Sequence, residues 1–183
     1  MPRCKGRKVY ARREGPPHPG VPKFLWEYVM IVHVDQSNKI ETTNKPSVLA
    51  MASSNLAVPT VRTVLVPAGV KQRGLATLEH TRHWGATRGA VALFTAATYI
   101  LVEPHLARID RLQIDPEYTG HEELIRSWLI DWARRRAAVD LREVIVFQPL
   151  GRGSPAHEAA LRAARQRRAD VVLHARQLLE LLV

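Results

Sequence analysis

The sequence has little cysteine and no long uninterrupted apolar run. Its single cysteine, Cys4, excludes an internal disulfide and a cysteine-rich zinc site. The longest apolar stretch, residues 89–102, is interrupted by polar residues and is shorter than the ~20 residues that span a bilayer. No apolar segment follows the basic N-terminus, so this end does not have the pattern of a secretory signal. We therefore expect a cytoplasmic protein without a membrane partner.

Negative charge is also scarce. The 183 residues include 27 Lys and Arg against 17 Asp and Glu, which gives a formal net charge of +10. Most of the positive charge is arginine, whose planar guanidinium can bind a phosphate through two parallel hydrogen bonds. This balance favours a polyanionic partner, and nucleic acid is the commonest one. A surface that is charged only for solubility is the alternative.

Two parts of the chain differ in composition. Residues 1–22 combine Lys and Arg with several prolines and show neither a helical nor a strand period. This composition predicts a flexible basic N-terminal arm. The chain as a whole is 46% hydrophobic, enough to fill one core at this length. We therefore expect residues 23–183 to form a single domain.

The expected strands and helices together predict an α/β fold. The expected strands are residues 28–35, 47–53, 61–66, 111–115 and 143–147, with a last short strand at 171–173. The expected helices are residues 84–102, 119–136 and 154–168, with a closing helical turn at 177–182. Short loops between the first three strands predict an antiparallel meander. The order β-β-β-α-β-α-β-α predicts a mixed sheet flanked by helices.

Two of the expected helices have start signals. Thr119 and Glu122 have the spacing of a capping box. In this motif each of the two side chains accepts a hydrogen bond from the backbone N–H of the other residue. Ser154 followed by Pro155 is typical of an N-cap and a first helical position. The sequence therefore predicts that helices begin at both places.

A few acidic residues stand where the expected strands end. Asp35 closes the first strand and Asp115 closes the fourth, while Glu117 lies on the same side of an extended chain as Asp115. A buried carboxylate is costly without a neighbouring cation, and oxygen ligands on adjacent strands suit Mg²⁺ or Mn²⁺. These residues are therefore candidate metal ligands. Alternatively, Asp35 caps its own turn and Asp115 begins an Asp-Pro turn.

Three short motifs resemble the ribonuclease H-like superfamily. The segment VHVDQSNK at 32–39 resembles its first motif, in which an aspartate ends the first strand, and IDPEY at 114–118 resembles its second motif. The segment AHEAAL at 156–161 is similar to the last helix of RuvC-like members, where a histidine precedes an aspartate. The β-β-β-α-β-α order is also that of this fold. The resemblance covers about residues 28–170.

This resemblance implies a metal-dependent nuclease. It implies that Asp35, Asp115 and Glu158 hold divalent ions, Mg²⁺ or Mn²⁺, and that His157 orients water or moves protons. The family also supplies a glutamate from its first helix, but residues 84–102 contain no acid. Either Glu117 fills this place or the carboxylate set is incomplete. A nucleic-acid-binding protein on the same fold, without enzymatic activity, is the alternative function.

The helix that begins at Ser154 carries the residues expected to contact the nucleic acid. Its arginines and their neighbours form a positive strip that suits a phosphate backbone, and they are Arg152, Arg162, Arg165 and Arg168. A solvated helix surface is the alternative for these residues, as it is for His157 and Glu158. The choice among DNA, RNA and a hybrid stays open. The oligomeric state stays open as well, and a homodimer is compatible with the sequence.

Overall fold

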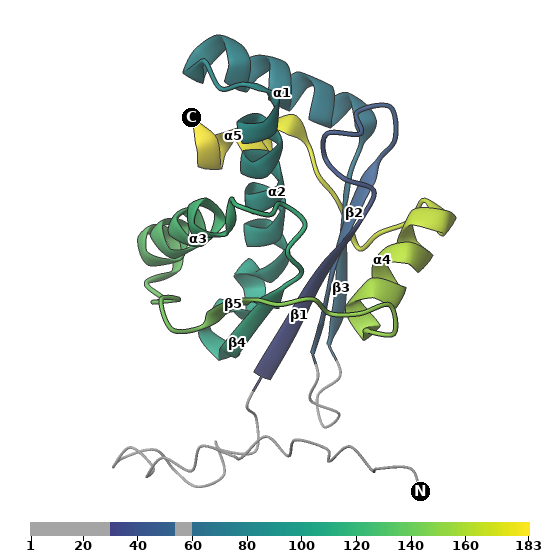
Figure 1. Cartoon of the computed structure of the whole chain (residues 1–183), viewed down its shortest axis with the longest axis vertical. Coiled ribbons are helices and arrows are strands. Elements are labelled where there is room, and N and C mark those ends of the chain that lie inside the picture. The colour runs from purple at the N-terminus through teal and green to yellow at the C-terminus, as the bar shows by residue number, and fades with distance from the viewer. Residues whose placement is uncertain (1–29, 54–59) are drawn as a thin grey trace, which may run out of the picture.

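The computed structural model describes residues 30–53 and 60–183, which form an α/β fold (Figure 1). The expected N-terminal arm, residues 1–22, lies outside these residues, as do the first two positions of the expected first strand. The domain boundary expected at residue 23 lies outside them too.

A mixed sheet forms the centre of the described part of the chain. Its strands are β1 (Met30–Ser37), β2 (Ser47–Ser53), β3 (Val61–Val66), β4 (Ile109–Ile114), β5 (Ile145–Phe147) and β6 (Val171–Val172). Their spatial order is β5-β4-β1-β2-β3-β6. The first three strands pair antiparallel, which confirms the predicted meander, and the other three join the sheet in parallel. Strand β1 therefore lies between an antiparallel and a parallel neighbour.

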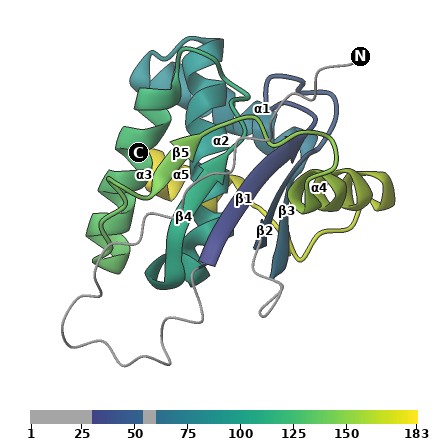
Figure 2. The same cartoon turned by 60° about the horizontal axis from the view of Figure 1, so that its bottom comes forward.

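Helices cover both faces of this sheet. They are α1 (Ala68–Arg82), α2 (Ala86–Val102), α3 (Glu122–Ala137), α4 (Pro155–Gln166) and α5 (Ala175–Leu182), with a 3-10 helix at Glu103–Arg108. Helix α4 packs on one face, against β1, β2 and β3, whereas α2 packs on the other face against β2 and β3. Helices α1, α3 and α5 pack around α2 on that second face (Figures 1 and 2). The main core lies between the sheet and α2.

Helix α1 departs from the expected order, which has one helix between the third and fourth strands. Its sequence contains Gly69 and Gly74, and glycine disfavours a helix interior. The close packing of α1 against α2 explains the glycine at position 74. A Cβ at Gly74 would lie 2.9 Å from Cδ2 of Leu93, and one at Gly89 would lie 3.0 Å from Cδ2 of Leu75. Gly74 and Gly89 therefore allow α1 and α2 to approach closely.

Helix α2 is the apolar centre of the fold. Together with the 3-10 helix it forms a run, Ala86–Arg108, of 23 residues that is long and apolar enough to cross a membrane. However, 72% of its apolar window is buried inside the fold. Fully buried Phe94 and Tyr99 contact the rings of Tyr118 and Trp132. Burial in this core accounts for the apolar composition of the run.

One of the two predicted helix starts is right and the other is wrong. Ser154 is the N-cap of α4, because its Oγ accepts a hydrogen bond from the backbone N–H of His157 at 3.1 Å. The capping box of Thr119 and Glu122 does not form, since α3 begins only at Glu122. Gly120 adopts φ +85°, and its N–H donates to the Glu122 carboxylate. This turn leaves Thr119 outside the helix.

Candidate metal centre

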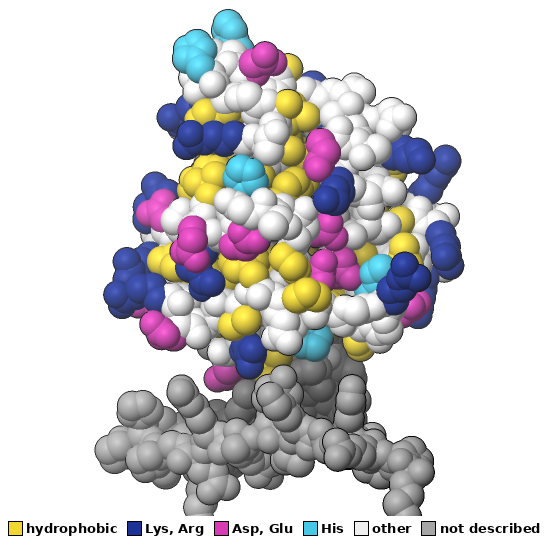
Figure 3. Space-filling view, viewed as in Figure 1, with side chains coloured by type: hydrophobic (Ala, Val, Ile, Leu, Met, Phe, Trp, Pro, Cys, Tyr) yellow, Lys and Arg dark blue, Asp and Glu magenta, His cyan; other side chains and the backbone are white. Residues whose placement is uncertain are grey.

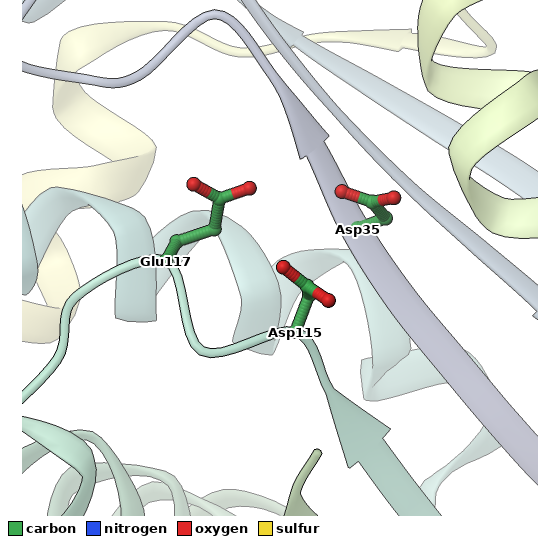
Figure 4. Close-up of side chains that lie close together, drawn as sticks. All are labelled: Asp35, Asp115 and Glu117. Carbon is green, nitrogen blue, oxygen red and sulfur yellow. The ribbon is translucent and has the colours of Figure 1, made fainter. Parts of the chain in front are cut away.

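Three carboxylates meet where β1 and β4 lie side by side. Asp35 is on β1, Asp115 directly follows β4, and Glu117 lies in the loop after it (Figure 4). One oxygen from each side chain lies within 4.8 Å of the others, so the group could hold a metal ion. We call these three residues the acidic site. Its composition of oxygen ligands is the one that hard divalent cations prefer.

Asp35 is the most buried member of the acidic site. Alternation along β1 directs Val32 and Val34 into the core beneath α2 and leaves Asp35 facing α4. Its side chain is 7% exposed. Its Oδ1 accepts a hydrogen bond from the backbone N–H of Gln36 at 2.6 Å, and its Oδ2 lies 2.8 Å from Nδ1 of His157. Asp35 therefore connects the sheet to the first turn of α4.

Asp115 continues the pairing of β4 with β1 and orders the segment that leads to α4. Its backbone N–H donates to the carbonyl of Val34 at 3.0 Å, which fixes Asp115 beside Asp35. Its Oδ1 accepts a hydrogen bond from the N–H of Leu150 at 2.8 Å. The second carboxylate oxygen of Asp115 has no hydrogen bond within the described residues. It is therefore free for a cation.

Glu117 lies beneath the loop between β1 and β2. The ammonium of Lys39 donates to the carbonyl oxygen of Glu117 at 3.0 Å and lies 3.9 Å from its carboxylate. Tyr118 donates to the carboxylate of Glu41 at 2.8 Å and accepts from the N–H of Ile40 at 3.2 Å. These contacts hold the loop against the acidic site. Lys39 is thus a cationic neighbour that the sequence analysis did not identify.

A buried lysine supports the same loop from the other side. The Lys71 side chain on α1 is fully buried, and its ammonium donates to the carbonyls of Lys39 at 3.2 Å and Thr42 at 2.6 Å. It also donates to Oγ of Ser47 at 2.9 Å. No sequence signal marks Lys71, because it stands in a helix that the sequence does not predict. Tyr118, in contrast, belongs to the IDPEY segment.

Burial, together with repulsion from neighbouring carboxylates, raises the pKa of two members of the acidic site, Asp35 and Glu117. Burial raises the pKa of Asp35, and the charge of Asp115 raises it further. The hydrogen bonds from Gln36 and His157 lower this pKa but do not cancel the rise. Burial raises the pKa of Glu117 to about 7, against the attraction of Lys39, and the neighbouring carboxylates add to the rise. Both burial and repulsion thus disfavour the charged forms of Asp35 and Glu117. A bound divalent cation would favour these charged forms.

Helix α4 brings His157, but not Glu158, to the acidic site. His157 is 28% exposed and contacts Asp35, as described above. Glu158 is exposed on the first turn of α4 and is not part of the group of carboxylates. Glu79 and Glu103, the acids that flank the predicted helix at 84–102, also lie outside this group. Glu117 is the residue that completes the group.

The arginines expected to contact nucleic acid are on the surface. Arg162 and Arg165 are exposed on α4, and Arg152 and Arg168 are exposed just before and after it. Figure 3 shows Lys and Arg side chains gathered at the right over α4, beside acidic and histidine side chains. At the left, over α3, basic and acidic side chains are mixed. Acidic side chains therefore offset the positive charge less over α4 than over α3.

No protein-family model matches the chain, and no curated protein matches its sequence.

Proposed function

We propose that this protein is a divalent-metal-dependent nuclease that hydrolyses phosphodiester bonds. The observation that carries the proposal is the convergence of Asp35, Asp115 and Glu117 beside His157. The antiparallel meander with β4 added in parallel beside β1 supports a ribonuclease H-like assignment, because the motif residues then lie together. The net charge of +10 supports a nucleic-acid substrate. The RuvC-like role of Glu158 is not supported, since Glu158 lies outside the acidic site.

The residues of the acidic site fit Mg²⁺ or Mn²⁺. All three supply carboxylate oxygens, the ligands that both ions prefer. One oxygen of Asp115 accepts a hydrogen bond from Leu150, and the two oxygens of Asp35 are held by Gln36 and His157. Such bonds orient a ligating carboxylate and are part of a metal site. Asp35, Asp115 and Glu117 would therefore hold the ion, with Glu117 replacing the Glu158 expected from the sequence.

Divalent ions bound at such a site neutralise the charge of the phosphodiester and lower the pKa of water. The chain's own contribution is to place a base beside them. An ionised carboxylate only accepts hydrogen bonds, so Nδ1 of His157 donates to Asp35 and leaves Nε2 as an acceptor. Since the His157 side chain is 28% exposed, Nε2 can take a proton from the attacking water. Asp35 orients this imidazole.

Cleavage assays with conservative variants test the proposal. Asp35→Asn and Asp115→Asn keep the side-chain volume but remove a negative ligand. We expect each to lower Mg²⁺-dependent cleavage by at least about a hundredfold, because a metal ligand is lost. Nucleic-acid binding should stay the same or tighten, since one repulsive charge near the phosphate is removed. Cleavage is measured on labelled duplex DNA, duplex RNA, an RNA–DNA hybrid and single strands.

Asp131→Asn is the matched control. Asp131 is an exposed aspartate on α3 that pairs with Arg135 and is not part of the acidic site. It should cut like the parent protein. Parental activity in Asp35→Asn and Asp115→Asn would remove the proposal. Tight binding by the parent without cleavage of any of these substrates would instead favour a nucleic-acid-binding protein without enzymatic activity.

A further inference from the structure

The arginines of this protein differ in whether they have acidic partners. Those on α3 and just after it each form an ion pair, and they are Arg126, Arg134, Arg135, Arg136 and Arg142. Those on and around α4 have no carboxylate partner among the described residues, and they are Arg152, Arg162, Arg165, Arg167 and Arg168. The positive charge around α4 is therefore not neutralised locally.

Two of these unpaired arginines line a hollow between α4 and β3. The hollow has a volume of about 570 Å³, and Arg162, Gln166 and Arg168 are on its wall. Its one carboxylate, that of Asp170, accepts hydrogen bonds from the N–H and Oγ1 of Thr63 at 2.7 and 2.8 Å. That carboxylate is thus engaged with β3. The two guanidinium groups and the amide of Gln166 remain as hydrogen-bond donors for a ligand.

We infer that this hollow binds a backbone phosphate of the nucleic acid whose phosphodiester reaches the acidic site. The inference rests on the proposed function. Helix α4 links the two places, because His157 in its first turn contacts Asp35 and Arg162 lies further along it. A guanidinium binds a phosphate through two parallel hydrogen bonds, and an amide N–H adds a neutral one. The hollow therefore has the donors of a phosphate subsite.

Helix α4 lies between the hollow and the acidic site. At about 100° per residue, Arg162 and Gln166 lie on the side of the helix turned away from His157, and they follow it by about 7.5 and 13.5 Å along the axis. A strand bound at both places therefore crosses over α4. This path lies on the face of the sheet that α4 covers and not across the ion-paired arginines of α3.

The test compares two variants that lose the same charge. Arg162→Gln with Arg168→Gln removes the guanidinium groups of the hollow. Arg134→Gln with Arg142→Gln removes two arginines that both pair with Asp140. Binding of the full chain to a fluorescein-labelled duplex and a single strand is measured over a range of KCl concentrations. We expect the first variant to lower the slope of log Kd against log salt by about 1 to 2, because phosphate contacts are lost. The control should keep the parent slope.

Equal slopes for the two double variants would overturn the inference, because the hollow would then contribute only net charge. Arg162→Lys with Arg168→Lys should restore most of the slope, which shows that the loss does not come from misfolding. A titration with inorganic phosphate distinguishes a small ligand from a backbone. Saturation of the hollow by phosphate at low concentration, with nucleic-acid binding unchanged, would also overturn the inference.

Cleavage of the same probes separates this inference from the proposed function. A protein that cuts nothing but shows the expected difference in slope has the phosphate subsite without the nuclease activity. A protein whose cutting depends on Asp35, but whose salt slope is unchanged in Arg162→Gln with Arg168→Gln, has the activity without the subsite. The nuclease activity and the phosphate subsite can therefore be disproved independently of each other.

Discussion

At the scale of single residues, the loop over the acidic site depends on a buried positive charge. The ammonium of Lys71 holds two loop carbonyls and Oγ of Ser47, and the loop in turn holds Lys39 against Glu117. Burial lowers the pKa of Lys71 to about 8, although the Glu41 carboxylate attracts the charged form. Lys71 thus supports the loop, although the same burial makes its ammonium group easier to deprotonate.

The low pKa of Lys71 predicts how stability varies with pH. The unfolded chain keeps the Lys71 proton up to about pH 10.5, whereas the folded chain loses it near pH 8. The unfolded state therefore binds more protons in this window, and the free energy of unfolding should rise with pH by roughly 1–3 kcal/mol relative to Lys71→Met. Urea unfolding of both proteins between pH 7 and 10.5 measures this difference.

Lys71→Met should also destabilise the protein at pH 7, by about 1–3 kcal/mol, because it leaves buried oxygen acceptors without a donor. Lys45→Met is the control, since Lys45 is an exposed lysine of the same loop. It should change neither the stability nor its pH dependence. A pH profile that is the same in Lys71→Met and in the parent would show that Lys71 keeps an ordinary proton affinity in the fold.

At the scale of elements, α4 determines what stands beside the acidic site. The Ser154 cap and Pro155 fix where the helix begins, and this start places His157 toward Asp35 and Glu158 toward solvent. Two adjacent residues in one helical turn therefore have different surroundings. Substitution of each in turn tests this difference.

His157→Ala should lower the rate of cleavage by about a hundredfold or more, because its proposed role is proton transfer. The affinity for Mn²⁺ should change little, since the ligands are the three carboxylates. Glu158→Gln should cost only about 0.3–1 kcal/mol of stability, the value of a charge at a helix start, and should leave cleavage unchanged. Cleavage kinetics and Mn²⁺ titrations check both variants. A large loss of cleavage in Glu158→Gln would restore Glu158 as a ligand.

The sequence predicts β2, β3 and the start of α4 well because their signals are local. Runs of β-branched and apolar residues define the strands, and Ser154 with Pro155 defines the helix start. Helix α1 could not be predicted, since Gly74 disfavours a helix unless Leu93 of α2 packs against it. Asp35, Asp115 and Glu117 could be nominated from their places at or just after the expected strand ends, although β1 continues past Asp35 to Ser37. Which of His157 and Glu158 joins them depends on how α4 docks, and a local pattern does not contain that information.

At the scale of the whole molecule, two regions of positive charge concern the proposed binding of nucleic acid. The described residues place unpaired arginines around α4, and the sequence places six Lys and Arg within residues 3–13, which lie outside the described part of the chain. Positive charges in this N-terminal sequence would add to the non-specific attraction of nucleic acid. The two regions should therefore have separable effects.

Deletion of residues 1–22 tests this separation. We expect weaker binding to nucleic acid and a smaller salt slope, because each neutralised phosphate releases about one counterion. The melting temperature should stay within about 2 °C of the parent value, since no described strand or helix includes these residues. Salt-dependent binding and thermal unfolding by circular dichroism measure the two effects. A large drop in melting temperature would show that the segment is part of the domain.

The parts of the acidic site come from distant places along the chain, and this has a consequence for folding. The β1–β2 hairpin forms from neighbouring residues, but Asp35 and His157 are 122 positions apart. Contacts of such long range form late, because the entropy of the intervening chain must be lost first. During synthesis, a ribosome-bound chain can build the meander and still lack His157. Completion of the site therefore waits until α4 has been synthesised, and a nascent chain should lack the proposed activity before α4 emerges.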